Sequence, residues 1–231
     1  MLKVLILIIF CSVVFVVTAS AQKESSNTKA QPLPSKTAKK ANQRPAADSS
    51  KTTQSEPFEK ASVETMAAQC VKFETEAGEI ELEMFPESAP ESVRSFLNLA
   101  AMGAFDTTTF NRIVPGFIVQ GGDLFTRQKM TPELDKRARR SLRDEPSLIK
   151  HERGIVSMAR SDEPNSATTN FFILVGEAPH LNGTFAAFGR VTRGMEVVDA
   201  VNKMPVENEK PTKPIRITRA TVALCPARLK S

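Results

Sequence analysis

The chain has 231 residues, enough for one large or two small domains, and its 31 Lys and Arg against 26 Asp and Glu give a net charge of +5. This excess is small and dispersed, which argues against specific nucleic-acid binding. The folded part has two histidines, no Cys-x-x-Cys pair, no glycine-rich phosphate loop and no G-x-S-x-G. A hydrolase or metalloenzyme is therefore poorly supported, and we expect no metal and no cofactor.

The first 21 residues have the pattern of a secretory signal peptide. Lys3 precedes an apolar run, and small residues at Ala19 and Ala21 form an A-x-A cleavage site. The alternative is an uncleaved membrane anchor, although the apolar run of about 15 residues is short for a bilayer span. Cys11 lies inside this run after a bulky residue, which disfavours lipid attachment. We expect an exported protein, in the periplasm or another compartment outside the cytoplasm.

A polar segment follows the signal pattern. From Gln22 to about Pro57 it consists mainly of Ser, Thr, Lys, Gln, Ala and Pro, and Leu33 is its only large aliphatic residue. Such a segment buries too little apolar surface to offset the entropy of ordering. A short helix between Phe58 and Gln69 is compatible with the sequence. We predict a disordered basic linker over residues 22–68, able to contact anionic surfaces weakly, and one folded domain over residues 69–231.

Hydrophobic periodicity changes at the start of the predicted domain. Apolar and polar residues alternate over 71–76 and 79–85 around Ala77-Gly78, which predicts a β-hairpin with one buried face. A helix is predicted next, over about 89–103, because Pro90 and Glu91 suit a first helical turn. Its apolar residues recur at helical spacing and form one stripe, at Val93, Phe96, Leu97 and Ala100.

Most of the remaining elements are short strand candidates. They cover 110–114, 117–120, 154–158, 171–175, 185–191 and 215–222, and a second helix is predicted over 195–203. Many short strands with few helices indicate a mainly β protein. Its sheet is expected to form a closed or nearly closed barrel, because closure removes exposed strand edges.

Two cysteines, Cys70 and Cys225, lie at the two ends of the predicted domain. In an oxidising compartment they could form a disulfide, which would close a loop over most of the domain. The chain-entropy argument allows such a bridge about 5 kcal/mol of stabilisation as an upper value. Two unpaired thiols are the alternative.

One motif stands out, F-N-R-I-V-P-G-F-I-V-Q-G-G-D from Phe110 to Asp123, in which a single Arg and a single Gln interrupt apolar residues. It closely resembles the central signature of cyclophilins. The resemblance extends from Val71 to Leu224 and includes S-M-A-R at 157–160, N-F-F-I at 170–173 and H-L-N-G-T-F-A-A-F-G-R-V at 180–191. It implies a closed eight-stranded antiparallel β-barrel capped by two α-helices, and a monomeric peptidyl-prolyl cis-trans isomerase that acts on proline-containing segments of unfolded or flexible proteins.

The resemblance also implies a role for each site residue. Arg112 would donate a hydrogen bond toward the prolyl nitrogen, and Gln120 would hold the guanidinium and contact the substrate backbone. The expected substrate-binding residues are Phe117, Ile118, Phe172 and Leu181 in the proline pocket, Ala159, Arg160 and Asn170 along the peptide groove, and His180 and Phe185 beside them. Alternatively, the four pocket residues are ordinary core residues and Arg112 is a salt-bridged surface residue.

Four positions depart from the common family pattern. His180 stands where many cyclophilins have Trp, which bears on cyclosporin binding, and Phe185 stands where His is common. Asn170 replaces a frequent Gln, and Arg160 replaces a common Asn. We expect both His151 and His180 to be surface residues without a function. Two other classes stay open: a cyclophilin-fold binding module or chaperone with slight turnover, and an envelope-associated structural protein acting through its basic linker.

Overall fold

The structure is a computed structural model that describes residues 55–226. The predicted signal peptide over 1–21 and most of the predicted linker lie outside the described residues. Within the described range, no helix is both long enough and apolar enough to cross a membrane.

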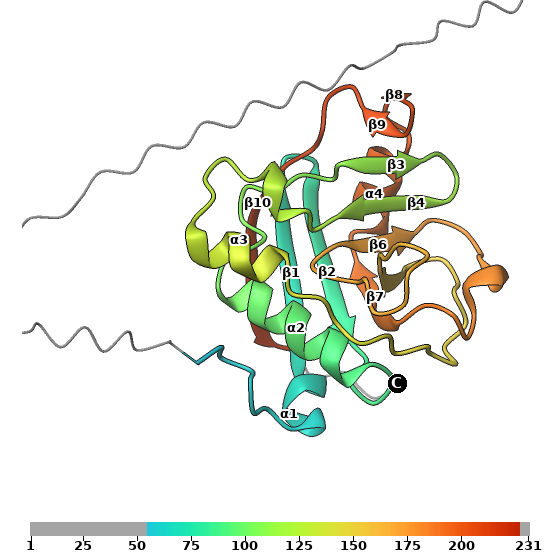
Figure 1. Ribbon diagram of the computed structural model, residues 1–231. Helices are drawn as coiled ribbons and strands as arrows, with labels where there is room; N and C mark the ends of the chain where they lie inside the picture. The colour runs from blue at the N-terminus through green and yellow to red at the C-terminus, as the bar shows by residue number, and fades with distance from the viewer. Residues whose placement is uncertain (1–54, 227–231) are drawn as a thin grey trace, which may run out of the picture. The chain divides into compact units, whose positions relative to one another are not determined.

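One eight-stranded sheet forms the body of the domain (Figure 1). Every neighbouring pair of strands is antiparallel. In spatial order the strands are β10 (Ile217–Leu224), β1 (Gln69–Thr75), β2 (Gly78–Met84), β7 (Ala187–Arg193), β5 (Ile155–Met158), β6 (Phe171–Leu174), β4 (Ile118–Gly121) and β3 (Arg112–Val114). These match the predicted strands to within a few residues.

The prediction of a closed barrel is wrong, because the sheet is an open, strongly curled half-barrel. Its outer strands, β10 and β3, form no ladder with each other, and only an isolated bridge joins Thr109 to Arg216. Two features explain the gap. Thr107 has a φ of 63°, which interrupts extended backbone before β3, and β3 itself is only three residues long. Irregular chain therefore bridges the seam, with Phe110 N donating to Ile215 O at 2.9 Å.

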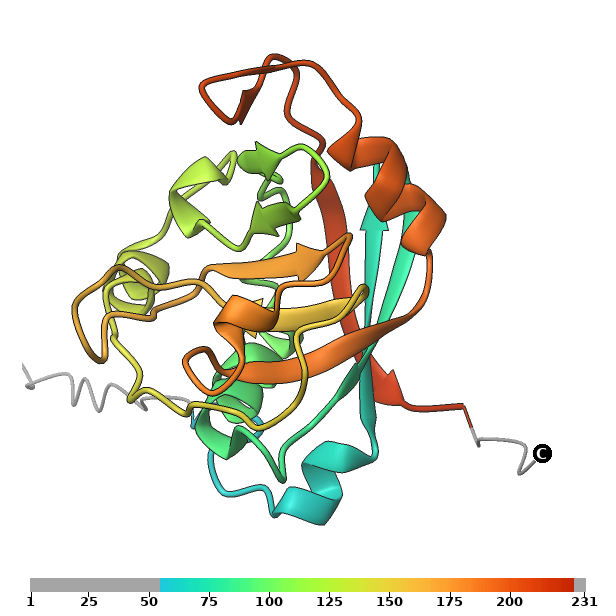
Figure 2. The same ribbon diagram turned by 90° about the vertical axis from the view of Figure 1, so that its right-hand side faces the viewer.

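The two predicted helices are present, as α2 (Pro90–Ala101) and α4 (Met195–Asn202), at opposite ends of the curled sheet (Figure 1, Figure 2). The structure has two further α-helices. One is α1 (Val63–Ala67), in the region where a short helix was only compatible with the sequence, and the other is α3 (Pro132–Ala138), which was not predicted. The sequence does carry a start signal for α3. Thr131 accepts a hydrogen bond from Leu134 N, and Pro132 occupies the first turn. Shorter elements are the 3-10 helices η1 (Leu124–Thr126) and η2 (Pro179–Leu181) and the hairpin of β8 (Val206–Glu207) and β9 (Lys210–Pro211).

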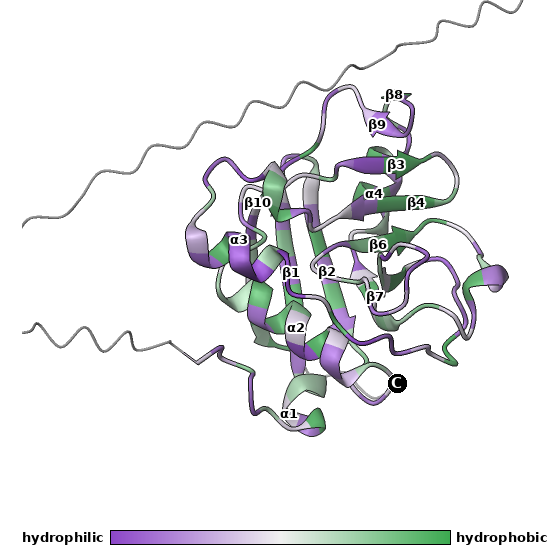
Figure 3. Ribbon diagram, viewed as in Figure 1, coloured by the Kyte–Doolittle hydropathy of each residue, from purple (hydrophilic) through white to green (hydrophobic). Residues whose placement is uncertain are grey.

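Apolar residues concentrate on the strands, for example along β4 and β6, whereas α3 is mostly hydrophilic (Figure 3). They form two separate clusters, since successive side chains of a strand point to opposite faces. Along β6, Phe171 and Ile173 join the main core, and Phe172 and Leu174 join a smaller cluster. The main core centres on phenylalanines whose rings pack edge to face, stacked or tilted, namely Phe73, Phe96, Phe105, Phe171 and Phe188. The smaller cluster is the one that builds the site described below.

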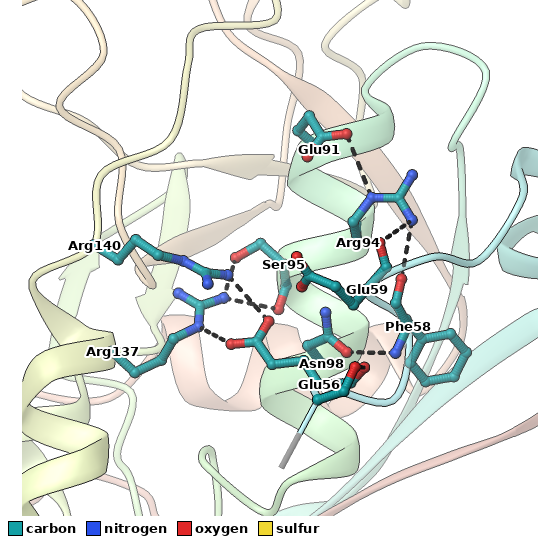
Figure 4. Close-up of polar contacts among 10 residues, drawn as sticks. Glu56, Phe58, Glu59, Glu91, Arg94, Ser95, Asn98, Arg137 and Arg140 are labelled. Carbon is teal, nitrogen blue, oxygen red and sulfur yellow. Dashed lines mark hydrogen bonds and ion pairs between the residues drawn. The ribbon is translucent and has the colours of Figure 1, made fainter. Parts of the chain in front are cut away.

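The packed domain begins further toward the N-terminus than the predicted boundary at residue 69. An arm over residues 55–62 lies against α2 and α3 (Figure 4). The Glu56 carboxylate accepts hydrogen bonds from Arg137 Nε at 2.9 Å and from Arg140 Nη2 at 3.0 Å. Arg94 Nη1 donates to the carbonyl oxygens of Phe58 and Ala61 at 2.9 and 2.7 Å. These arginines lie far along the chain from the arm, so its composition alone could not show that it packs.

Cys70 and Cys225 form a disulfide in the structure, with their sulfur atoms 2.14 Å apart. Cys70 belongs to β1, and Cys225 follows directly after β10. Pairing of these two strands brings the cysteines together, since the Cα partner of Cys70 in the ladder is Ala223. The backbone N–H of Cys225 also donates to Ala68 O at 2.9 Å.

Candidate active site

Arg112 and Gln120 lie side by side on a tight hairpin. They are register partners in the β3–β4 ladder, and Arg112 Nη1 donates to Gln120 Oε1 at 3.2 Å. The turn between the strands uses Gly116 at a φ of +74°, a conformation that favours glycine. Phe117 N then donates back to Val114 O at 3.0 Å and closes the turn. The short P-G turn in the sequence thus determines that the arginine meets the glutamine.

An acidic side chain that the sequence did not suggest completes the surroundings of Arg112. Glu209, in the turn between β8 and β9, accepts a hydrogen bond from Arg112 Nε at 2.7 Å. The Arg112 side chain remains 43% exposed in this ion pair. No local pattern links the two residues, because they are 97 positions apart in the chain.

The apolar side of the site comes from the smaller hydrophobic cluster. Ile118 on β4, Phe172 on β6 and Leu181 on η2 are buried there, and Phe117 and Phe185 pack against them. Phe172 is the register partner of Gln120, and its ring meets the Phe185 ring edge to face at 6.0 Å. These residues are thus separate from the main core on the other face of the sheet.

Together these groups surround a cavity of about 130 Å³. Nine of the eleven predicted site residues line it: Arg112, Phe117, Ile118, Gln120, Ala159, Arg160, Phe172, Leu181 and Phe185. The cavity therefore has one wall with a cation and an amide and another wall of aromatic and aliphatic side chains. Such a shape can accept a small apolar ring while a hydrogen-bond donor reaches it from one side.

Two of the predicted residues, Asn170 and His180, are not among those that line the cavity. Asn170 precedes β6, and its carbonyl oxygen accepts a hydrogen bond from Ala159 N at 2.9 Å. His180 is exposed on η2, with its ring 5.7 Å from the Phe117 ring. The next residue of η2, Leu181, is the one that faces the cavity.

Two of the departures from the family pattern contact each other. The Arg160 guanidinium lies over the Phe185 ring, with Cζ 4.8 Å from the ring centroid. Arg160 Nη1 also donates to Ser161 O at 2.8 Å. A cation over an aromatic face is a stabilising contact, so the two replacements form one wall of the site together.

The prediction that His151 is a surface residue is wrong, because it is only 1% exposed. Its Nε2 lies 2.9 Å from Ser157 Oγ, and its Nδ1 lies 3.2 Å from Asn182 Oδ1. Burial lowers the pKa of His151, although the hydrogen bond to Asn182 acts in the opposite direction. His151 thus connects Ser157 on β5 to Asn182, the residue that follows Leu181 at the end of η2. Among residues 55–226, no three His, Cys, Asp or Glu side chains gather as a metal site would need.

An open antiparallel half-barrel with an apolar slot on one face and an arginine at the edge of the slot defines a peptide-binding protein suited to proline. The chain belongs to the cyclophilin-type peptidyl-prolyl cis-trans isomerases: the family described as "Cyclophilin type peptidyl-prolyl cis-trans isomerase/CLD" matches residues 70–222. It is therefore an enzyme of this class and has the cyclophilin fold.

Similar proteins carry the same description. The chain is 38% identical over 154 residues to peptidyl-prolyl cis-trans isomerase CYP18-1 of Arabidopsis thaliana, covering 66% of this chain and 94% of that protein. It is also 38% identical over 141 residues to CYP23 of the same plant, covering 60% of this chain and 62% of CYP23. Among solved structures, a cyclophilin-type isomerase of Cryptosporidium parvum matches with a TM-score of 0.60 and 31% identity, covering 68% of this chain and 99% of that one.

Proposed function

We propose that this isomerase accelerates rotation about Xaa-Pro bonds through the Arg112 guanidinium, and that it does so during the folding of exported proteins. The observation that carries the mechanism is the placement of Arg112, which borders the cavity, is held by Gln120 and is still partly exposed. No covalent step is needed, because the reaction breaks and forms no bond.

The chemistry requires weaker conjugation in the imide. Nitrogen shares its lone pair with the carbonyl group, which gives a rotation barrier of about 18–20 kcal/mol. In the twisted transition state this lone pair returns to nitrogen, so a donor that points at nitrogen stabilises the transition state more than either planar state. Arginine suits this role because it remains charged at physiological pH.

The remaining residues would hold the substrate. Phe117, Ile118, Phe172 and Leu181 offer apolar contacts to the pyrrolidine ring. Along the groove, the backbone N–H and C=O of Arg160 make no hydrogen bond within residues 55–226, so both are free to pair with an extended peptide. Binding the peptide on both sides of the proline would hold the chain ends while the imide turns.

The mechanism is tested by Arg112→Ala in a protease-free peptide isomerisation assay and in a proline-limited refolding reaction. We expect kcat/KM to fall at least about tenfold, since one transition-state donor is lost. Arg153→Ala is the matched control, because Arg153 is 46% exposed and paired with Asp199 but does not line the cavity. Equal rates for the wild type and Arg112→Ala would instead support a binding module.

Export is proposed from two features. Residues 1–21 have the pattern of a signal peptide, and the Cys70–Cys225 bridge suits an oxidising compartment. We expect the protein, when expressed in a host that secretes it, to begin at Gln22 and to show no free thiol after unfolding without reductant. Two titratable thiols, or an intact first segment in the cytoplasmic fraction, would contradict this proposal.

A further inference from the structure

The hairpin of β8 and β9 ends in a tight turn against the outer edge of β3. Its two turn residues, Asn208 and Glu209, have φ values of 49° and 65°, as a two-residue turn of this kind requires. Asparagine is common at such positions, whereas glutamate is not, because its side chain disfavours positive φ. The backbone preference of glutamate therefore does not explain why Glu209 stands at this position.

The turn is attached to β3 by its main chain. Ile113, the residue after Arg112, donates its backbone N–H to Glu209 O at 2.8 Å. This bond uses the strand edge that β4 leaves free, since β4 pairs with the other side of β3. As a result, the Glu209 side chain begins directly beside Arg112, and its Oε2 accepts from Arg112 Nε at 2.7 Å.

The guanidinium is thereby held at two of its three nitrogens, from two different elements. Gln120 on β4 accepts from Nη1, and Glu209 in the β8–β9 turn accepts from Nε. Nη2 makes no hydrogen bond within the described part of the chain. A planar group held at two points has a defined orientation, whereas a group held at one point can swing about its flexible stem. Orientation of this kind determines how well a catalytic group reaches the reacting atom.

We propose that Glu209 is a positioning residue for the isomerase reaction: it orients the plane of the Arg112 guanidinium so that the remaining donors face the cavity. The inference rests on the proposed role of Arg112. Both side chains are about half exposed, 43% for Arg112 and 48% for Glu209, so their ion pair contributes little to the stability of the fold. A loss of turnover on removing Glu209 would therefore reflect misplacement of Arg112 rather than unfolding.

The test compares Glu209→Asn and Glu209→Ala with wild type in the peptide isomerisation assay. Asparagine suits the positive φ of the turn but is too short to take over the contact, so this variant keeps the hairpin and removes the anchor. We expect kcat/KM to fall about threefold to tenfold in both variants, with the loss in kcat and little change in KM. Glu207→Gln is the control, because it removes a charge from the same hairpin at a residue with no contact to Arg112.

A second comparison separates positioning from a general effect of the hairpin. In an Arg112→Ala background there is no guanidinium to hold, so adding Glu209→Asn should change the remaining kcat/KM by less than about 1.5-fold. A fall of the same size in both backgrounds, or an unchanged or increased rate for Glu209→Asn alone, would overturn the inference. If Arg112→Ala retains full activity, the proposed mechanism itself fails, and this outcome is distinct from failure of the role of Glu209 alone.

Discussion

Among the arginine–glutamate pairs within residues 55–226, two have nearly equal geometry but opposite surroundings. In the N-terminal arm, Arg137 Nε donates to Glu56 at 2.9 Å, and the two side chains are only 6% and 14% exposed. At the edge of the cavity, Arg112 Nε donates to Glu209 at 2.7 Å, and these side chains are 43% and 48% exposed. Because the two pairs differ in burial, we expect the first to stabilise the fold and the second, under the proposed mechanism, to act in the reaction.

The physical reason is the cost of separating each pair. Arg137 Nη2 also donates to Ser95 Oγ at 2.7 Å, so its donors serve the protein interior (Figure 4). Burial and the neighbouring Arg140 lower the pKa of Arg137, whereas Glu56 raises it, so the carboxylate offsets part of the cost of burying this cation. Arg112 is instead partly open to water, so separating its pair with Glu209 costs the fold little stability.

The largest expected effect concerns the Cys70–Cys225 disulfide, which joins the start of β1 to the end of β10. It closes a loop between residues 155 positions apart. Cys70→Ser with Cys225→Ser should therefore lower the free energy of unfolding by as much as about 5 kcal/mol. Urea unfolding with and without reductant measures this. Equal midpoints for the oxidised protein and the double variant would show that the bridge adds no stability.

A somewhat smaller effect is expected when the buried pair is broken. Arg137→Ala leaves the Glu56 carboxylate partly buried and held only by Arg140, which should cost about 3 kcal/mol of stability. Activity below the unfolding temperature should remain at the wild-type level. Arg139→Ala is the control, because Arg139, directly after α3, is exposed and paired with Asp135, and its removal should change the unfolding midpoint little. If folded Arg137→Ala lost activity, the Arg137–Glu56 pair would affect the reaction as well as stability, and the two pairs would not differ in role.

As the pH falls, the structure around His151, next to the cavity, should lose stability before the arm over residues 55–62. Because burial lowers the pKa of His151 below its ordinary value of 6.5, the unfolded chain binds a proton first as the pH falls. The stability from neutral His151 is thus present above about pH 6.5 and decreases as the pH falls through this value toward the lower pKa of the folded state. Hydrogen exchange should increase in residues 181–185 while residues 56–61 stay protected. His151→Gln should remove this difference, and His180→Gln should not.

The smallest expected effect is on the stability of the catalytic variant. The free energy of unfolding of Arg112→Ala should lie within about 0.5 kcal/mol of the wild-type value, since the Arg112–Glu209 pair is exposed, although we expect its turnover to fall strongly. Thermal or urea unfolding of the variant used in the kinetic assay measures this directly. A loss of several kcal/mol would mean that Arg112 supports the fold as Arg137 does.

Local patterns in the chain predict a large part of this structure. Alternation identifies the strands that build the sheet, and the motif from Phe110 to Asp123 brings Arg112 and Gln120 together, because the hairpin that joins them is formed by neighbouring residues. Because side chains alternate along β6, Phe172 faces the cavity and Phe171 faces the main core. We did not predict α3, although Thr131 and Pro132 are ordinary signals for the start of a helix.

What the sequence by itself determined was the strands of the main sheet and two of the helices, because these depend on side-chain periodicity and short turns. Its resemblance to cyclophilins also predicted the family and most of the cavity lining. Only the tertiary structure decided that the sheet stays open, that the arm packs and that Glu209 meets Arg112. Those contacts join residues 81 and 97 positions apart for Glu56 with Arg137 and for Arg112 with Glu209. No local preference encodes such a meeting; it follows from the way the strands and helices pack.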